Sequence, residues 1–495
     1  MNAAPSARAT ALLTLALCVL LGAPALAAPA KPLKAERAAL RTVEREVIKL
    51  AKYAARGKDL ATASQELELG LAVDPASKKL KREAAKVERQ TKKAKKKKRK
   101  ARPPRASFLT KLAEKRAAAH ETIALALAEA AIAIETESPK RYARYVDLIQ
   151  TRFKSKAALD RLDLVYFSPY YAWVSQAEAK VLLAGGERHK GKLLDKAAVE
   201  RLNASHSTWS SPWIVSDEIH EIRTTVGLRE AKRTLAYVSS YRNYFLKRFG
   251  DAWEFQAPKG KLPVILTKTQ ADLESQMRIA TRGQQMGTQG IQGAAFYLQS
   301  TGSLNPCFVT YEPKEATGRT FKIERFEDLM IPLAHEVTHQ IVFEYSKFAA
   351  DATRQIKHQF WAVEAIANYM GYHSFDGTKW TLRRPNMIPM GGGMIEGPFA
   401  HCLHNANELP TLERFTALSQ SQFMTVNNYH QAATLASFLL EGEGGKYRKQ
   451  FIKLLSTVHR VKDSSSTWND AFPGVDRAAM QREWVKFVKA IKLDS

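Results

Sequence analysis

An apolar stretch of the sequence contains His335, Glu336 and His339. These two histidines and one glutamate have the spacing of a metal site. On a helix, residues four apart share one face, so the imidazoles of His335 and His339 can bind one zinc ion. Glu336 lies about 100° further round the helix, beside the metal but off the ligand face. Zinc lowers the pKa of its bound water to about 7, so Glu336 is placed to act as the general base. The same pattern also occurs in helices that merely carry two surface histidines, so a third ligand is required.

Glu364, 25 residues beyond His339, is the candidate third ligand. Catalytic zinc takes three protein ligands and keeps one open position, and two histidines with one glutamate are an established set. Glu364 stands on an otherwise apolar stretch, where an unpaired buried carboxylate is costly and a cation removes the cost. Asn368 follows on the same helix face and is expected to support a ligand imidazole. The alternative is that Glu364 faces solvent, and no zinc site then forms.

The two segments together resemble the gluzincin zinc metallopeptidases, in particular poorly characterised secreted bacterial gluzincin-like domains. The motifs are H-E-x-x-H at His335–His339 and W-x-x-E-x-x-A-x-Y at Trp361–Tyr369, and the resemblance covers roughly residues 207–491. It implies a thermolysin-like zincin domain with one Zn²⁺ per chain, held by His335, His339 and Glu364. The chain departs from the family by having Ala365 where glycine is common. It also has Asn368 where thermolysin-type members have aspartate, which weakens the expected support of the histidine.

The resemblance extends to a helical segment near residue 430. In the family, a tyrosine at the position of Tyr429 donates its hydroxyl to the developing oxyanion, and such a donor stabilises a tetrahedral intermediate. The adjacent His430 is the alternative donor. A lone tyrosine on a helix also serves commonly as a packing residue, so Tyr429 and His430 both stay candidates for catalysis.

These residues need an α+β domain to position them. A long helix is predicted from an apolar face between Leu228 and Phe249, followed by strands over Leu262–Leu266 and Cys307–Tyr311. Helices dominate after Phe326, and Asp328 and Pro332 suit the start of the helix that carries His335. The expected fold is therefore a small sheet with a mainly helical C-terminal lobe, preceded by an all-helical N-terminal region.

The N-terminal part divides into four segments. Residues 1–27 have the charged start, apolar middle and Ala25-Leu26-Ala27 exit of a signal peptide, so the protein is expected to be exported, to the periplasm or outside the cell. Residues 28–91 are expected to be helical; Ala63, Leu67, Gly70 and Pro75 resemble the second half of one tetratricopeptide unit, and an ordinary helical pair is the alternative. Residues 92–105 are a basic linker that ends in two prolines, and 106–206 form a second helical region. No transmembrane segment is expected after removal of the signal.

Composition agrees with a folded, basic, exported protein. The chain of 495 residues is 45% hydrophobic and 25% charged, so it can build a large core, which excludes general disorder. Its net charge is +27, and ten of the basic residues lie in 92–105. Once Cys18 leaves with the signal, Cys307 and Cys402 remain, either as a disulfide or as two buried thiols.

The favoured function is an exported zinc-dependent peptidase that cleaves a peptide or protein substrate. The alternative is an inactive peptidase-like envelope protein that binds a partner through its helical N-terminal region. Residues 92–105 also suit contact with an anionic envelope surface. Nucleic acid is the weakest partner hypothesis, because the tract has no interleaved aromatic residues and export removes the protein from most nucleic acid.

Overall fold

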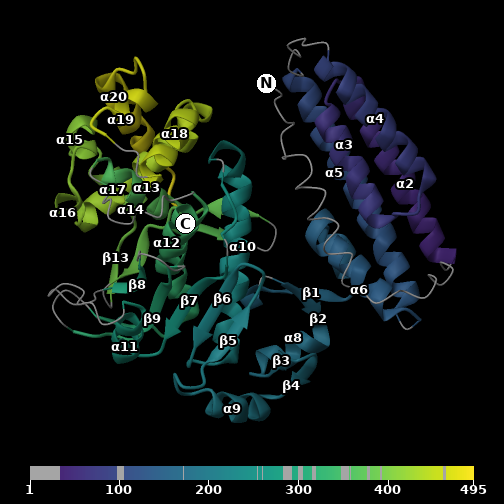
Figure 1. Cartoon of the computed structure of the whole chain (residues 1–495), viewed down its shortest axis with the longest axis horizontal. Coiled ribbons are helices and arrows are strands. Elements are labelled where there is room, and N and C mark those ends of the chain that lie inside the picture. Colours follow the sequence, from purple (N-terminus) through teal and green to yellow (C-terminus); the bar gives the residue numbers. More distant parts are fainter. Residues whose placement is uncertain are drawn as a thin grey trace, which may run out of the picture. The chain divides into compact units, whose positions relative to one another are not determined.

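The computed structural model places most of the chain after the first 33 residues (Figure 1). The predicted signal peptide, 1–27, and most of the basic linker, 92–105, lie outside the described part; α4 carries helix into the start of that linker, as far as Lys96. The described residues are 34–96, 105–135, 137–170, 172–253, 255–258, 260–281, 293–298, 305–314, 319–346, 356, 358–375, 379–390, 393–460 and 464–494.

The first compact unit ends at Val165, and its described part is helical as far as Arg161. In α2 a buried stripe at Val43, Val47, Leu50 and Ala54 packs against α3 and α5. Gly70 permits the close approach of α3, because an added Cβ would lie 2.9 Å from a Val47 methyl carbon. The helices are α2 (Lys34–Arg56), α3 (Leu60–Val73), α4 (Lys78–Lys96), α5 (Ala106–Ile134), α6 (Pro139–Leu148), η1 (Ile149–Phe153) and α7 (Lys156–Arg161).

Helix α5 has the length and composition of a membrane span, although no such segment was expected after residue 27. By length and composition, Ala106–Ile134 is apolar enough to cross a membrane. Several of its apolar residues, among them Ile123, Leu127 and Ala131, are buried, and the helix packs along α2. A core helix of a bundle has the same composition, so this feature alone assigns no membrane segment.

The second unit begins at Tyr166, well before residue 207. Its first part contains short strands where a second helical region was expected. Aromatic and β-branched residues favour β1 and β2, and Lys190 and Gly191, both with positive φ (47° and 79°), form the tight turn between β3 and β4. The elements here are β1 (Leu164–Phe167), η2 (Ser168–Tyr170), β2 (Ala172–Ser175), α8 (Gln176–Leu183), β3 (Glu187–His189), β4 (Lys192–Leu194) and α9 (Lys196–Ser205).

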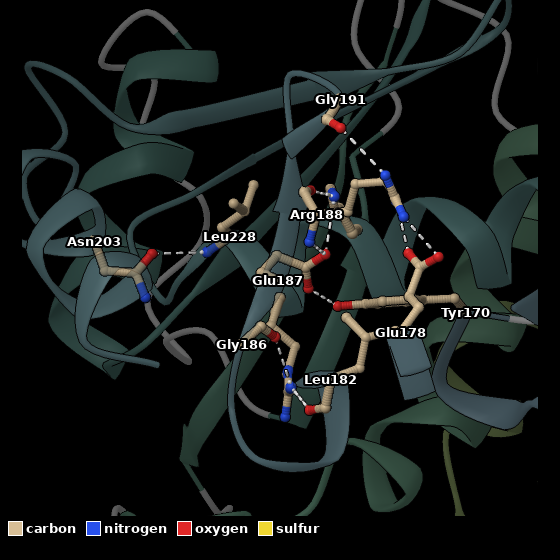
Figure 2. Close-up of polar contacts among 11 residues, drawn as sticks. Tyr170, Glu178, Leu182, Gly186, Glu187, Arg188, Gly191, Asn203 and Leu228 are labelled. Atoms are coloured by element: carbon tan, nitrogen blue, oxygen red, sulfur yellow. Dashed lines mark hydrogen bonds and ion pairs between the residues drawn. The ribbon is translucent and has the colours of Figure 1, made fainter. Parts of the chain in front are cut away.

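A buried carboxylate joins this region to the long helix α10 (Leu228–Trp253). Glu187 is fully buried, and it accepts a hydrogen bond from the Tyr170 hydroxyl (Figure 2). It accepts another from Lys232 Nζ at 2.9 Å. Nearby, Asn203 Oδ1 accepts the backbone N–H of Leu228 at 3.0 Å and so satisfies a free donor at the start of α10.

We expect Glu187→Ala to lower the free energy of unfolding by about 2 kcal/mol, less than for a fully buried pair because Lys232 keeps partial access to water. Urea denaturation measures the change. The matched control is Glu200→Ala, whose exposed ion pair with Lys196 spans 3.8 Å and should contribute less than about 0.5 kcal/mol. Equal effects of the two substitutions would contradict the structural role of Glu187.

The main sheet of the second unit is mixed and confirms the α+β class. Its order is β5-β6-β7-β9-β8; β6, β7 and β9 run parallel, while the outer strands β5 and β8 are antiparallel to their neighbours. The strands of this sheet, with the helix that lies between β7 and β8 in the sequence, are β5 (Trp213–Ser216), β6 (His220–Thr224), β7 (Leu262–Thr267), α11 (Gln270–Ala280), β8 (Gly293–Tyr297) and β9 (Cys307–Lys314).

The rest of the second unit is mainly helical, and two of its helices carry the chemistry-bearing residues. Helix α12 packs against β8, β9 and α13, while α13 packs on α17 and α18 (Figure 1). The elements are α12 (Phe326–Tyr345), α13 (Phe360–Gly371), β10 (His373–Phe375), β11 (Trp380–Leu382), β12 (Met387–Met390), β13 (Gly393–Glu396), α14 (Pro398–His404), α15 (Leu412–Thr416), α16 (Gln420–Phe423), α17 (Val426–Glu441), η3 (Gly442–Gly444), α18 (Arg448–His459), α19 (Thr467–Ala471) and α20 (Arg477–Lys489). Cys307 and Cys402 are buried free thiols.

Candidate metal centre

Helix α12 presents both histidines from one face. Leu329, Leu333, Val337 and Ile341 are buried at four-residue intervals and fix the helix on the core. The helix begins at Phe326, two residues before Asp328 and six before Pro332, so Pro332 lies inside it. The carboxylates of Glu327 and Asp328 in the first turn favour this earlier start because they complement the positive end of the helix dipole.

Helix α13 brings Glu364 to the two histidines. Its neighbours Trp361, Ile366 and Tyr369 are buried, so the carboxylate is held among apolar side chains, with 10% of its surface exposed. Glu364 Oε2 lies 3.2 Å from His335 Nε2 and 3.6 Å from His339 Nε2. The two Nε2 atoms are 3.1 Å apart. The alternative in which Glu364 faces solvent is therefore wrong.

These three atoms form a group that can hold a metal ion. With bonds of about 2.1 Å, adjacent ligands of a tetrahedral ion lie about 3.4 Å apart, and the three measured separations bracket this value. Glu364 Oε2 is also buried without a donor of hydrogen-bond geometry among the described residues. A cation at the centre of the triangle satisfies that oxygen, so the donor set fits a metal ion.

Glu336 lies beside this triangle and is held by a backbone group. Its Oε1 is 3.9 Å from His335 Nε2, and its Oε2 accepts the N–H of Tyr297 at 2.7 Å. Tyr297 belongs to β8, the edge strand of the sheet. The carboxylate is therefore fixed off the ligand set but within its immediate surroundings.

The electrostatics of the group favour a divalent cation. Burial raises the pKa of Glu336, which makes it a stronger base than an exposed glutamate. Although burial opposes the effect, the imidazoles of His339 and His335 hold the pKa of Glu364 well below its usual range. A bound cation would take the place of the imidazole protons in stabilising the Glu364 carboxylate.

Asn368 lies where the spacing predicts, next to a ligand. Its side-chain N–H donates to the backbone oxygen of Glu364 at 2.8 Å. The pKa of His335 is raised: burial opposes this, but the side chains of Glu364, Glu336 and Asn368 together outweigh it. Asn368 thus bonds to the backbone of the residue that supplies the carboxylate.

Tyr429 and His430 point in different directions from α17. The Tyr429 ring centroid is 6.2 Å from that of His335, and its hydroxyl donates to Met424 Sδ at 3.2 Å. Burial and the carboxylates of Glu364 and Glu336 raise the pKa of Tyr429, so its hydroxyl keeps its proton. His430 instead packs against His401, with ring centroids 4.9 Å apart. The structure therefore brings Tyr429, but not His430, to the ring of a histidine in the centre.

Sequence reasoning missed the group that anchors β8 to α12. The Tyr297 hydroxyl donates to Glu344 Oε1 at 3.1 Å, and the side chain of Asn305 donates to the same oxygen at 2.9 Å. Almost every residue type has a backbone N–H, so the contact of the Tyr297 N–H with Glu336 could not be predicted from the sequence.

Comparison with models of known protein families finds no match to this chain, and comparison with curated proteins finds none either.

Proposed function

We propose that this protein is an exported, zinc-dependent peptidase of gluzincin type with a thermolysin-like catalytic domain. The observation that carries the proposal is the convergence of His335, His339 and Glu364 from two helices, with Glu336 held beside them. A mixed sheet whose antiparallel edge strand adjoins the histidine helix supports it. The resemblance of the motifs at His335–His339 and Trp361–Tyr369 to that family supports it further.

The chain's own residues have separable roles in this proposal. His335, His339 and Glu364 would hold the zinc ion, which when bound supplies a Lewis acid for the scissile carbonyl and acidifies a water molecule. Glu336 accepts a proton from the attacking water and returns it to the leaving amine. The N–H of Tyr297 keeps that carboxylate in place during both transfers. Tyr429 donates its hydroxyl to the oxyanion, for which it must exchange its bond to Met424.

Zinc analysis and peptide cleavage test the function together. The purified protein is expected to carry zinc at the His335 centre and to cleave members of a diverse peptide library. A chelator should abolish cleavage, and zinc should restore it. A protein that binds zinc at this centre but cleaves nothing in the library would overturn the peptidase proposal.

We expect Tyr429→Phe to lower kcat by about 100-fold, because one fixed oxyanion donor is removed. Zinc affinity and unfolding should stay unchanged, since the hydroxyl contacts only Met424 among the described residues. Steady-state peptide cleavage measures the effect. Tyr447→Phe, which removes a donor to Glu483 instead, is the control. Equal kcat values for Tyr429→Phe and the unmodified protein would remove Tyr429 from the mechanism.

A second candidate function, partner binding by the N-terminal unit, is favoured by a basic groove between α2 and α5. The groove has a volume of about 610 Å³, and its lining includes Lys49, Lys52, Arg56 and Lys115 against one carboxylate, Glu46. Such a surface suits an anionic partner, either an acidic segment of a protein or an envelope polymer.

Reversal of charge in this groove is expected to weaken binding to a polyanion such as polyglutamate by at least about tenfold at low salt. The variant is Lys52→Glu with Lys115→Glu, and fluorescence anisotropy at several salt concentrations measures it. Lys78→Glu with Lys81→Glu, on α4, is the control for net charge. If both pairs lower the affinity equally, the groove is not the binding surface.

A further inference from the structure

Glu344 ties the edge strand β8 to the helix that carries the proposed base. It lies on α12 eight residues after Glu336, on the same face of the helix. Its Oε1 accepts the Tyr297 hydroxyl at 3.1 Å and the side-chain N–H of Asn305 at 2.9 Å. The amide of Asn305 also donates to the Tyr297 hydroxyl oxygen at 3.2 Å. The three side chains therefore form a closed triangle of hydrogen bonds.

Tyr297 makes three separate contacts with α12. Alternate backbone N–H groups of an edge strand point away from the neighbouring strand and need another acceptor. Glu336 Oε2 accepts the N–H of Tyr297 at 2.7 Å. The ring of Tyr297 stacks on Phe343, with centroids 5.7 Å apart, and its hydroxyl donates to Glu344. The place of the N–H that holds Glu336 therefore depends on the side chain of the same tyrosine.

Asn305 extends the restraint from β8 to the interior of the sheet. Its backbone N–H is a third donor to Glu344 Oε1, at 3.2 Å. Its backbone oxygen accepts from the side chain of Gln340 at 2.9 Å, and that side chain also donates to the backbone oxygen of Pro263 in β7 at 2.9 Å. Gln340 is fully buried on α12. The triangle is therefore fixed relative to β7 as well as to β8.

The Glu344 carboxylate is held by neutral donors. In the described part of the chain no lysine or arginine pairs with it, and three N–H and O–H groups bond to its Oε1. Hydrogen bonds to an ionised acceptor are stronger than those to a neutral one. Glu344 therefore restrains Tyr297 and Asn305 more tightly than glutamine would at the same position, although glutamine also offers an acceptor oxygen.

We propose that Glu344 is a positioning residue for Glu336, acting through Tyr297. The contacts run from the Glu344 carboxylate to the Tyr297 side chain, and from the Tyr297 N–H to one oxygen of Glu336. The other oxygen of Glu336 lies 3.9 Å from His335 Nε2, on the side of the metal ligands. A misplacement of about 1 Å in a catalytic site lowers the rate by about 100-fold. This kinetic consequence rests on the proposed peptidase function, whereas the restraint on Glu336 does not.

A double-substitution cycle on the full, zinc-loaded chain tests whether Glu344 acts through Glu336. Glu344→Ala is expected to lower kcat for peptide cleavage by about 30-fold, with KM and zinc content unchanged. In a Glu336→Gln chain, the same substitution should lower the residual kcat by less than about twofold, because the positioned group has already been disabled. Equal fold losses in the two backgrounds would overturn the proposal.

Two further variants separate positioning from a general loss of structure. Glu344→Gln keeps an acceptor oxygen and is expected to retain at least about a third of kcat. Glu483→Ala is the control, because it removes the acceptor of another tyrosine hydroxyl, that of Tyr447 at 2.9 Å, and it should leave kcat unchanged. A Glu344→Gln chain as slow as Glu344→Ala would also contradict the proposed role.

Hydrogen exchange of the Tyr297 amide measures the restraint without any need for peptide cleavage. We expect Glu344→Ala to speed that exchange by at least about tenfold, while the amides of α20 in the same chain exchange as before. Mass spectrometry with fragmentation of the full chain records both. Tyr297→Phe, which removes only the hydroxyl, provides the same comparison if Glu344→Ala does not fold.

The two readouts distinguish failure of this proposal from failure of the proposed function. Unchanged exchange at Tyr297 would overturn the positioning role of Glu344, whether or not the chain cleaves peptides. Faster exchange in a chain that cleaves no peptide would support the restraint on Glu336 and overturn only the peptidase function.

Discussion

Glu336→Gln is expected to lower kcat for peptide cleavage by about 1,000-fold while leaving bound zinc in place. Glutamine keeps the size of the side chain, and its amide oxygen can still accept the N–H of Tyr297, which lies 2.7 Å from the carboxylate. What is lost is the ability to take a proton from water. The effect should therefore fall on kcat, because the ligands of the metal and the surface that binds substrate are unchanged.

Steady-state kinetics and zinc analysis on the same preparation measure both quantities. Glu327→Gln is the matched control, since it removes a carboxylate from the exposed first turn of the same helix, where it pairs with Arg233. We expect that variant to keep full activity. A Glu336→Gln protein that retained more than a tenth of the original kcat would show that another group is the base.

Glu364→Ala is expected to weaken zinc binding by more than about 100-fold, because it removes one of three protein ligands, and loss of supporting contacts alone costs 10- to 100-fold. The carboxylate oxygen lies within 3.6 Å of both imidazole nitrogens, so the substitution removes the proposed ligand atom itself. Without it, His335 and His339 remain as a two-ligand site. Competition with a chromophoric chelator measures the affinity.

Asn368→Ala gives a graded comparison at the same centre. Asn368 bonds to the backbone oxygen of Glu364 and is not one of the three proposed ligands, so its removal should weaken zinc binding only about tenfold. The order of affinities, unmodified above Asn368→Ala above Glu364→Ala, distinguishes a ligand from a supporting residue. If Glu364→Ala binds zinc as tightly as the unmodified protein, Glu364 is not a ligand.

The common face of His335 and His339 could be predicted because helix geometry alone determines it. A four-residue spacing places His335 and His339 on one face in any helix, and the apolar neighbours of Glu364 predict that it is buried. The long helix from Leu228 and the strands β7 and β9 followed from periodicity in the same way. In each case the information lies within about twenty residues of sequence.

The parts that could not be predicted depend on contacts between distant segments. Neighbouring residues on a helix differ by about 100° in direction, so the sequence offered Tyr429 and His430 equally. Packing of α17 against α13 and α14 decided between them, by turning Tyr429 to His335 and His430 to His401. Likewise, the short strands between Leu164 and Leu194 have helix-forming neighbours, and pairing with each other decides their conformation.

The double attachment of Tyr297 to α12 has a consequence for thermal behaviour. Its main-chain nitrogen bonds to Glu336 and its hydroxyl to Glu344, two turns further along the same helix. Both contacts are made to the same helix, α12, so β8 and the Glu336 side chain are expected to move together. The position of the Glu336 carboxylate is thus fixed when the chain folds. Warming should leave it intact until the surrounding sheet itself melts.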